Sequence, residues 1–83
     1  MYRVRFTRQA QKDIQKLTPK LREKLKTILR QQIAVNPHAG KPLVGELKGY
    51  YSLRLSYKDR IVYAIDEGEL VVLVIRARTH CGD

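Results

Sequence analysis

The sequence has little of several residue types that define common protein classes. Its single cysteine cannot form an internal disulfide, and no group of residues has the spacing of a metal-ligand cluster. The chain contains no run of about 18 apolar residues, which a transmembrane helix requires. Its N-terminal segment also lacks the apolar core of a secretory signal peptide. The sequence therefore indicates a cytoplasmic protein with no metal site, no small-molecule cofactor and no membrane partner.

Acidic residues are also scarce. The chain has 17 lysines and arginines against 8 aspartates and glutamates, for a formal net charge of +9. Such an excess can simply keep a small protein soluble, but it also favours a polyanionic partner, nucleic acid above all. A membrane-surface helix fits less well, because the basic residues are spread over the predicted strands as well as the helices.

The 83 residues predict one small domain spanning residues 1–83. The hydrophobic fraction of 43% is typical of a folded protein rather than a disordered one. Alternation of Tyr2, Val4 and Phe6 with arginines predicts a short first strand. Thr7 is placed to cap a first helix over residues 8–17, because its hydroxyl can accept a hydrogen bond from an unpaired amide of the first turn.

Thr18 and Pro19 mark the start of a second helix, since proline is well suited to a first helical position. The helix ends before Asn36-Pro37. Residues 37–49 are rich in glycine and proline and are expected to form a loop. Apolar residues at helical spacing form one stripe of this second helix: Leu21, Leu25, Ile28, Leu29 and Ile33.

Three strand-like segments follow between residues 50 and 80. Alternating apolar residues over 51–55 and 61–65 predict two amphipathic strands, and the continuous apolar run over 70–75 predicts a central strand. The order β-α-α-β-β-β favours an α+β fold, in which a helix hairpin packs on one face of a largely antiparallel four-stranded sheet.

Basic and ionisable residues recur on the sheet face opposite the expected core. Alternation along the last strand places Arg76, Arg78 and His80 on one face, and residues 71, 73, 75 and 77 on the other. Together with Arg54 and Arg60, three strands then present cations on the same open face. Planar guanidinium groups bind phosphate through paired, charge-assisted hydrogen bonds.

RNA carries its own nucleophile, because its 2′-hydroxyl can attack the adjacent phosphate. That reaction needs a group that accepts the proton, a group that protonates the leaving 5′-oxygen, and cations that stabilise the transition state. His80 is the natural proton carrier near neutral pH. Tyr57, in a turn beside the basic strand ends, could stack on a base.

Plainer interpretations exist for each of these residues. A histidine near a chain end is usually a surface residue, and Arg60 could pair with Asp59 or Asp66. Arg76 and Arg78 could protect an edge strand from aggregation. The basic helix faces are most simply solvated surface.

Four features together resemble the RelE/ParE superfamily of bacterial toxins, and within it the RelE, YoeB and YafQ-type mRNA interferases. They are the element order and the segments GKPLVGELKGYYSLRL, DRIVYAID and VVLVIRARTH. The resemblance spans essentially the whole chain. It implies a toxin of a type II toxin–antitoxin system, neutralised by a cognate antitoxin, that cuts mRNA in the A site of the 70S ribosome. The implied reaction is a metal-independent attack by the 2′-hydroxyl.

The resemblance also implies roles for individual residues. Arg60 matches an arginine that stabilises phosphate, and Thr79-His80 resembles a pair whose histidine is an acid/base candidate. Arg78, and less closely Arg76, match basic positions of the last strand, and Arg54 matches one on the second strand. Ser52 stands where RelE proper often has lysine, and Cys81 where YoeB-like members often have an aromatic residue. We therefore expect Arg60, His80 and Arg78 to be catalytic, and Arg54, Arg76, Ser52 and Tyr57 to contact substrate.

Two other functions are alternatives to the mRNA endonuclease. The chain could be a ParE-like inhibitor of DNA gyrase or a non-toxic RNA-binding module.

Overall fold

A computed structural model describes residues 2–57 and 59–79, except the side chains of residues 47, 78 and 79. Predictions concerning His80 and Cys81 lie outside the described residues. The chain forms helices α1 (Arg8–Gln15) and α2 (Pro19–Ile28), and α2 continues into a π-helical turn over Leu29–Ile33. The strands are β1 (Arg3–Phe6), β2 (Lys41–Pro42), β3 (Tyr50–Arg54), β4 (Asp59–Asp66) and β5 (Val71–Thr79).

Both helices begin where the capping residues predict. The Thr7 hydroxyl accepts a hydrogen bond of 3.0 Å from the amide of Ala10, and the Thr18 hydroxyl accepts one of 3.3 Å from Leu21. Each bond satisfies an amide that the first helical turn leaves unpaired. The two threonines therefore fix where the helix hairpin starts and where it turns back.

The observed sheet confirms the α+β class but has five strands instead of the predicted four. Its order is β1-β5-β4-β3-β2, with β1 parallel to β5 and every other pair antiparallel. The fifth strand, β2, has two residues and pairs Lys41 with Ser52 at the edge. A strand this short, with a proline in it, has no alternation that a sequence pattern could detect.

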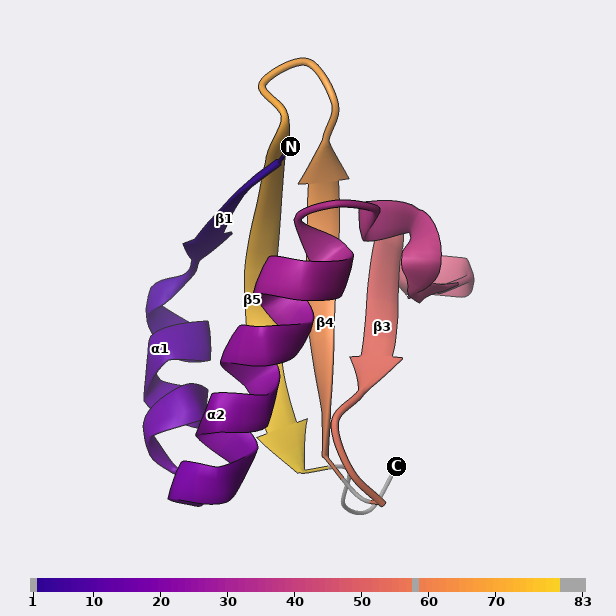
Figure 1. The fold of residues 1–83 in the computed structure, drawn as a ribbon. Coiled ribbons are helices and arrows are strands. Elements are labelled where there is room, and N and C mark those ends of the chain that lie inside the picture. Colours follow the sequence, from indigo (N-terminus) through magenta and orange to yellow (C-terminus); the bar gives the residue numbers. More distant parts are fainter. Residues whose placement is uncertain (1, 58, 80–83) are drawn as a thin grey trace.

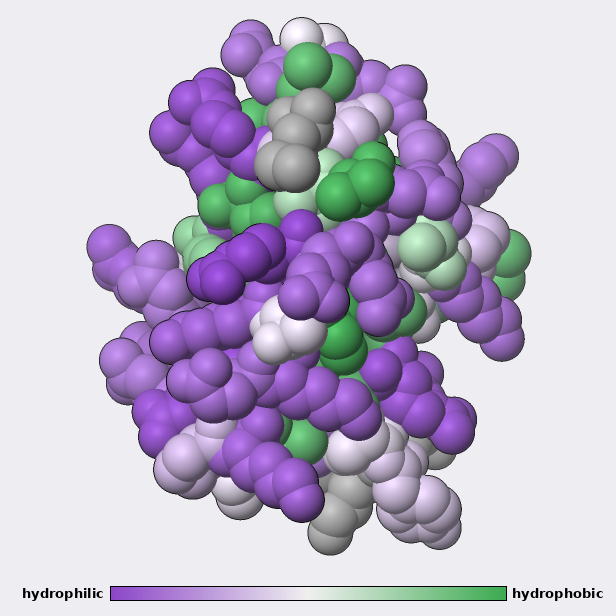
Figure 2. All heavy atoms as spheres, viewed as in Figure 1, coloured by the Kyte–Doolittle hydropathy of each residue, from purple (hydrophilic) through white to green (hydrophobic). Residues whose placement is uncertain are grey.

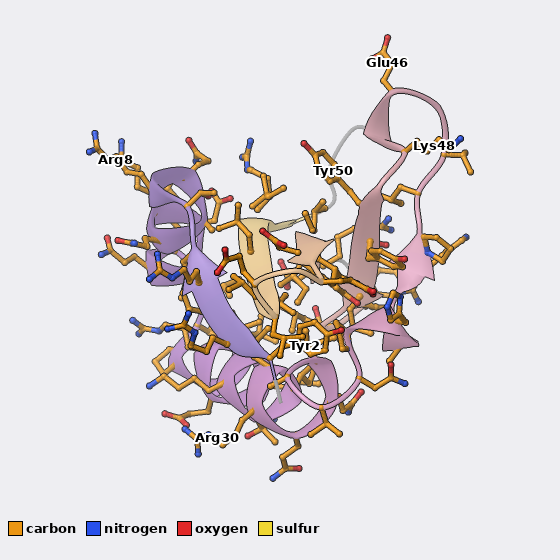
Figure 3. The ribbon with its side chains drawn as sticks, turned by 90° about the horizontal axis from the view of Figure 1, so that it is seen from above. Tyr2, Arg8, Arg30, Glu46, Lys48 and Tyr50 are labelled. Carbon is orange, nitrogen blue, oxygen red and sulfur yellow. The ribbon has the colours of Figure 1, made fainter. Side chains whose placement is uncertain are left out.

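The helices cover one face of the sheet (Figure 1). Their apolar stripes meet the inward residues of β4 and β5 in a single core, in which Ile33, Ile61, Tyr63, Val72 and Val74 are fully buried. Seen from above, α2 lies beneath the sheet while α1 runs along the β5 side (Figure 3). None of the helices in the described ranges is long and apolar enough to cross a membrane.

A one-residue register shift in β5 corrects the predicted division of its side chains between the two faces. Val62 pairs with Arg76, but the next residue, Tyr63, pairs with Val74, so that Ile75 is the additional residue of a β-bulge. Val72, Val74 and Ala77 consequently face the core, whereas Leu73 is 37% exposed. Strict alternation of residues 71, 73, 75 and 77 on the core side was therefore wrong.

Candidate functional site

Two of the predicted site residues face one another across the open side of the sheet. Arg54 of β3 is the register partner of Arg60 of β4, and Arg60 is in turn the partner of Arg78 of β5. Directly paired residues of antiparallel strands share one face of a sheet. Among the described residues no carboxylate forms an ion pair with Arg54 or Arg60. This excludes, within the described ranges, the interpretation that Arg60 pairs with Asp66.

A groove of about 310 Å³ lies next to this arginine pair. Its lining residues come from β2, β3, β4 and the turn before β2: Ala39, Lys41, Ser52, Leu53, Arg54 and Arg60. Ser52, only 9% exposed, is the register partner of Lys41. The groove thus presents three cationic side chains and one hydroxyl, a set that can bind the oxygen atoms of a phosphate group.

Arg76 is held differently from the other predicted arginines. Its Nε atom donates a hydrogen bond of 2.8 Å to the Oδ2 atom of Asp13 in α1. The same oxygen accepts a bond of 3.2 Å from the backbone amide of Ala77, and Oδ1 accepts one of 3.0 Å from Gln9. A guanidinium group has five N–H donors, so Arg76 retains donors for a second acceptor while its position is set by Asp13.

Opposing effects act on the Asp13 carboxyl group, which is 6% exposed. Burial raises its pKa, but hydrogen bonds from Gln9, Arg76 and the Ala77 amide, together with the charge of Arg76, hold the pKa below its usual value. Asp13 is therefore a buried, ionised acceptor between α1 and β5.

Tyr63 anchors the segment that brings Lys41 to the groove. Its hydroxyl donates a hydrogen bond of 2.7 Å to the carbonyl oxygen of Pro37 and accepts one of 3.0 Å from the amide of Gly40. Burial raises the pKa of Tyr63, with the Gly40 amide opposing this and Tyr51 adding to it, so the hydroxyl stays protonated and can donate. These bonds fix the backbone immediately before β2.

A second set of contacts holds the same segment from the helix side. The imidazole of His38 lies 3.2 Å from the Tyr51 hydroxyl and 2.6 Å from a carboxylate oxygen of Glu67, and Tyr51 stacks on Tyr63. The contact with Glu67 joins the segment before β2 to the β4–β5 turn.

The remaining predicted residues are less constrained. Tyr57 is 91% exposed in the turn after β3 and does not line the groove, so its role in stacking stays a prediction. Arg78 is placed only by its backbone register with Arg60, and His80 lies outside the described residues. The described part of the chain holds no group of three or more histidine, cysteine or acidic side chains that could bind a metal ion.

Sequence reasoning missed two residues of this region. Lys41 falls in the segment predicted to be a loop, and only its pairing with Ser52 shows that it belongs to the sheet. Asp13 lies among the polar residues of α1, which in an amphipathic helix usually face solvent. One signal could have identified it, because it is the only acidic residue in α1.

Comparison with known proteins assigns the chain to a family. Residues 4–80 match the family described as ParE toxin of type II toxin–antitoxin system, parDE. The chain is also 37% identical over 75 residues to Toxin RelE of Mycobacterium tuberculosis, a match that covers 89% of this chain and 76% of that protein.

Solved structures agree with the sequence comparison. The toxin–antitoxin complex RelBE2 of Mycobacterium tuberculosis contains a chain with a TM-score of 0.85 and 33% identity, covering 94% of this chain and 96% of that one. The intact RelBE toxin–antitoxin complex of Escherichia coli contains one with a TM-score of 0.80 and 29% identity, covering 95% and 96%.

Proposed function

Because this chain belongs to the ParE toxin family, in the RelE/ParE superfamily of type II toxin–antitoxin toxins, we propose that it is a ribosome-dependent mRNA endonuclease acting in the cytoplasm. The observation that carries the proposal is the arginine pair of β3 and β4, Arg54 and Arg60, beside a groove that also holds Lys41. Two guanidinium groups directly opposite one another destabilise a sheet. Their position beside a groove is better explained by an anionic ligand than by a contribution to folding.

The chemistry follows from a phosphate bound in the groove. The 2′-hydroxyl of the preceding nucleotide loses its proton and attacks phosphorus, and the bond from phosphorus to the 5′-oxygen breaks. The 5′-oxygen takes up a proton, which leaves a 2′,3′-cyclic phosphate and a 5′-hydroxyl. Arg60 and Arg54 would stabilise the charge that develops on the phosphate oxygens, and we assign proton transfer to His80.

Replacing His80 with alanine tests this assignment. After induction in a bacterium, mapping of mRNA 5′ ends is expected to show cuts at codon-phased positions for the unchanged protein. Loss of a general acid–base group typically lowers the rate by roughly 10²–10⁴-fold, so few or no cuts are expected for His80→Ala. Equal cutting by the variant would mean that a residue other than His80 transfers the proton, although the protein would still be an endonuclease.

Inhibition of DNA gyrase is the second candidate, favoured by the matched family's description as a ParE toxin. Such a toxin would act by binding and would need no proton carrier. Growth arrest with intact mRNA and a DNA-damage response would support it.

The partner that neutralises the toxin can be assigned a surface. Two adjoining apolar hollows, which share Phe6, Lys26 and Leu29, form a groove along α2 that faces β1 and α1, and Figure 2 shows hydrophobic surface interrupting the hydrophilic helix side. Basic residues also line it, and none of the described residues that line it is acidic; the apolar and basic lining includes Val4, Phe6, Leu25, Leu29, Arg22, Lys26 and Arg30. We propose that an amphipathic, acidic segment of the cognate antitoxin binds here.

Charge reversal in this groove should weaken neutralisation. A Lys26→Glu/Arg30→Glu double variant is expected to bind the adjacently encoded antitoxin more slowly, by about tenfold or more at low salt, because like charges then oppose the encounter. Lys20→Glu/Lys24→Glu, with the same charge change at exposed positions of α2 outside the groove, is the matched control. Equal association rates for the two double variants would contradict the proposed surface.

A further inference from the structure

A β-bulge near the end of β5 turns the following arginines away from the core. Val72 and Val74 face the helices and are fully buried. With strict alternation, Arg76 and Arg78 would follow them to the core side. The bulge at Ile75 reverses the phase, so that Ala77 is buried and Arg78 is in register with Arg60. Bulges redirect side chains in this way.

Among the described residues, no strand pairs with the outer edge of β5 beyond Val74. β1 ends at Phe6, whose register partner is Val74. Beyond that point, α1 and its cap supply the hydrogen bonds. The Thr7 amide donates to the Val74 carbonyl oxygen at 3.0 Å, and the Thr7 hydroxyl donates to that of Ile75 at 2.9 Å.

Asp13 accepts the next hydrogen bonds along this edge of β5. A single oxygen of its carboxylate accepts from the Ala77 amide and from Arg76 Nε, the two residues that follow the bulge. Figure 3 shows α1 beside β5 rather than beneath it, which is the position this contact requires. The carboxylate thereby satisfies a buried amide and neutralises a cation next to a cluster of like charge.

We propose that Asp13 is a positioning residue: by holding the Ala77 amide and the Arg76 guanidinium, it keeps the end of β5 in the bulged register that aligns residue 78 with Arg60 and Arg54. Its effect on catalysis rests on the proposed endonuclease function. Its effect on register does not, so the two can be tested separately.

The test compares Asp13→Ala with Leu17→Ala in two measurements. Leu17 is a core residue of 8% exposure that lines neither groove, so it controls for loss of stability alone. The first measurement is the set of backbone nuclear Overhauser effects between residues 60 and 78 and between residues 63 and 74. We expect Asp13→Ala to lose the former and keep the latter, and Leu17→Ala to keep both.

The second measurement is the kcat of ribosome-dependent mRNA cleavage at a temperature where both variants are folded. A misplacement of about 1 Å in a reacting group can lower the rate on the order of 10²-fold, and we expect a loss of that size for Asp13→Ala only. An unchanged 60–78 contact in Asp13→Ala, or equal losses of kcat in the two variants, would overturn the proposal. If the unchanged protein cleaves no mRNA, the endonuclease proposal fails, and the contact between residues 60 and 78 still decides the role of Asp13.

Discussion

Arg60→Ala is expected to lower mRNA cleavage by roughly 10²–10³-fold, the effect of removing one preorganised donor from a developing oxyanion. Arg60 lines the groove, its register partners are arginines on both sides, and it forms no ion pair within the described part of the chain. The measurement is the rate of cleavage on programmed ribosomes, with growth arrest after induction as the cellular counterpart.

The stability of this variant separates a functional role from a structural one. Because Arg54 lies directly opposite Arg60, removing one charge relieves a repulsion in the sheet. We therefore expect the melting temperature of Arg60→Ala to equal or exceed that of the unchanged protein. Arg8→Ala, at an exposed residue that points away from the sheet in Figure 3, removes the same charge and should leave cleavage within about twofold. Lost cleavage in the control, or full cleavage by Arg60→Ala, would remove the arginine pair from the mechanism.

Gly40→Ala is expected to be among the most destabilising single substitutions in the chain. A Cβ atom at this position would overlap the Tyr63 hydroxyl oxygen and lie 3.0 Å from the carbonyl oxygen of Ser52. Overpacking typically costs about 1–3 kcal/mol, and breaking the bonds of the Tyr63 hydroxyl adds about 1–3 kcal/mol. In a domain of this size each kcal/mol shifts the melting temperature by about 4–8 °C, so thermal unfolding should show a loss of more than roughly 10 °C.

A double variant identifies the cause of this loss. In a Tyr63→Phe background the hydroxyl is gone, so Gly40→Ala should cost less than it does alone, whereas independent sites would give additive losses. Gly68→Ala is the matched control, because the nearest atom to its new Cβ would be 3.5 Å away. Additive losses at residues 40 and 63 would contradict the assigned contact. The link to function is Lys41, which follows Gly40 directly and lines the groove.

The parts of the fold that follow local rules could be predicted from the sequence. Thr7 and Thr18 cap the helices because side-chain hydroxyls at these positions satisfy adjacent amides, and this requires no knowledge of the tertiary structure. The strand over residues 59–66 alternates cleanly because one of its faces is buried. The placement of Arg54 and Arg60 on the open face followed from the same alternation.

The features that were missed depend on contacts between distant segments. The bulge lies in a continuous apolar run, in which the residues on both faces of the strand are apolar. A one-residue shift therefore does not change the hydrophobic pattern of the sequence. β2 is a strand only because β3 lies beside it, and Asp13 bonds the Ala77 amide at a point where β1 no longer flanks β5. Each of these contacts positions a residue of the candidate site or its neighbour.

The most direct test of the central claim uses purified protein, ribosomes programmed with an end-labelled mRNA, and the same mRNA without ribosomes. We expect cleavage only with ribosomes, upstream fragments that end in a 2′,3′-cyclic phosphate, and cleavage by Arg60→Ala that is slower by roughly 10²–10³-fold. A parallel assay of DNA supercoiling by gyrase should show no inhibition. Intact mRNA together with inhibited supercoiling would contradict the proposed endonuclease and would identify gyrase as the target instead.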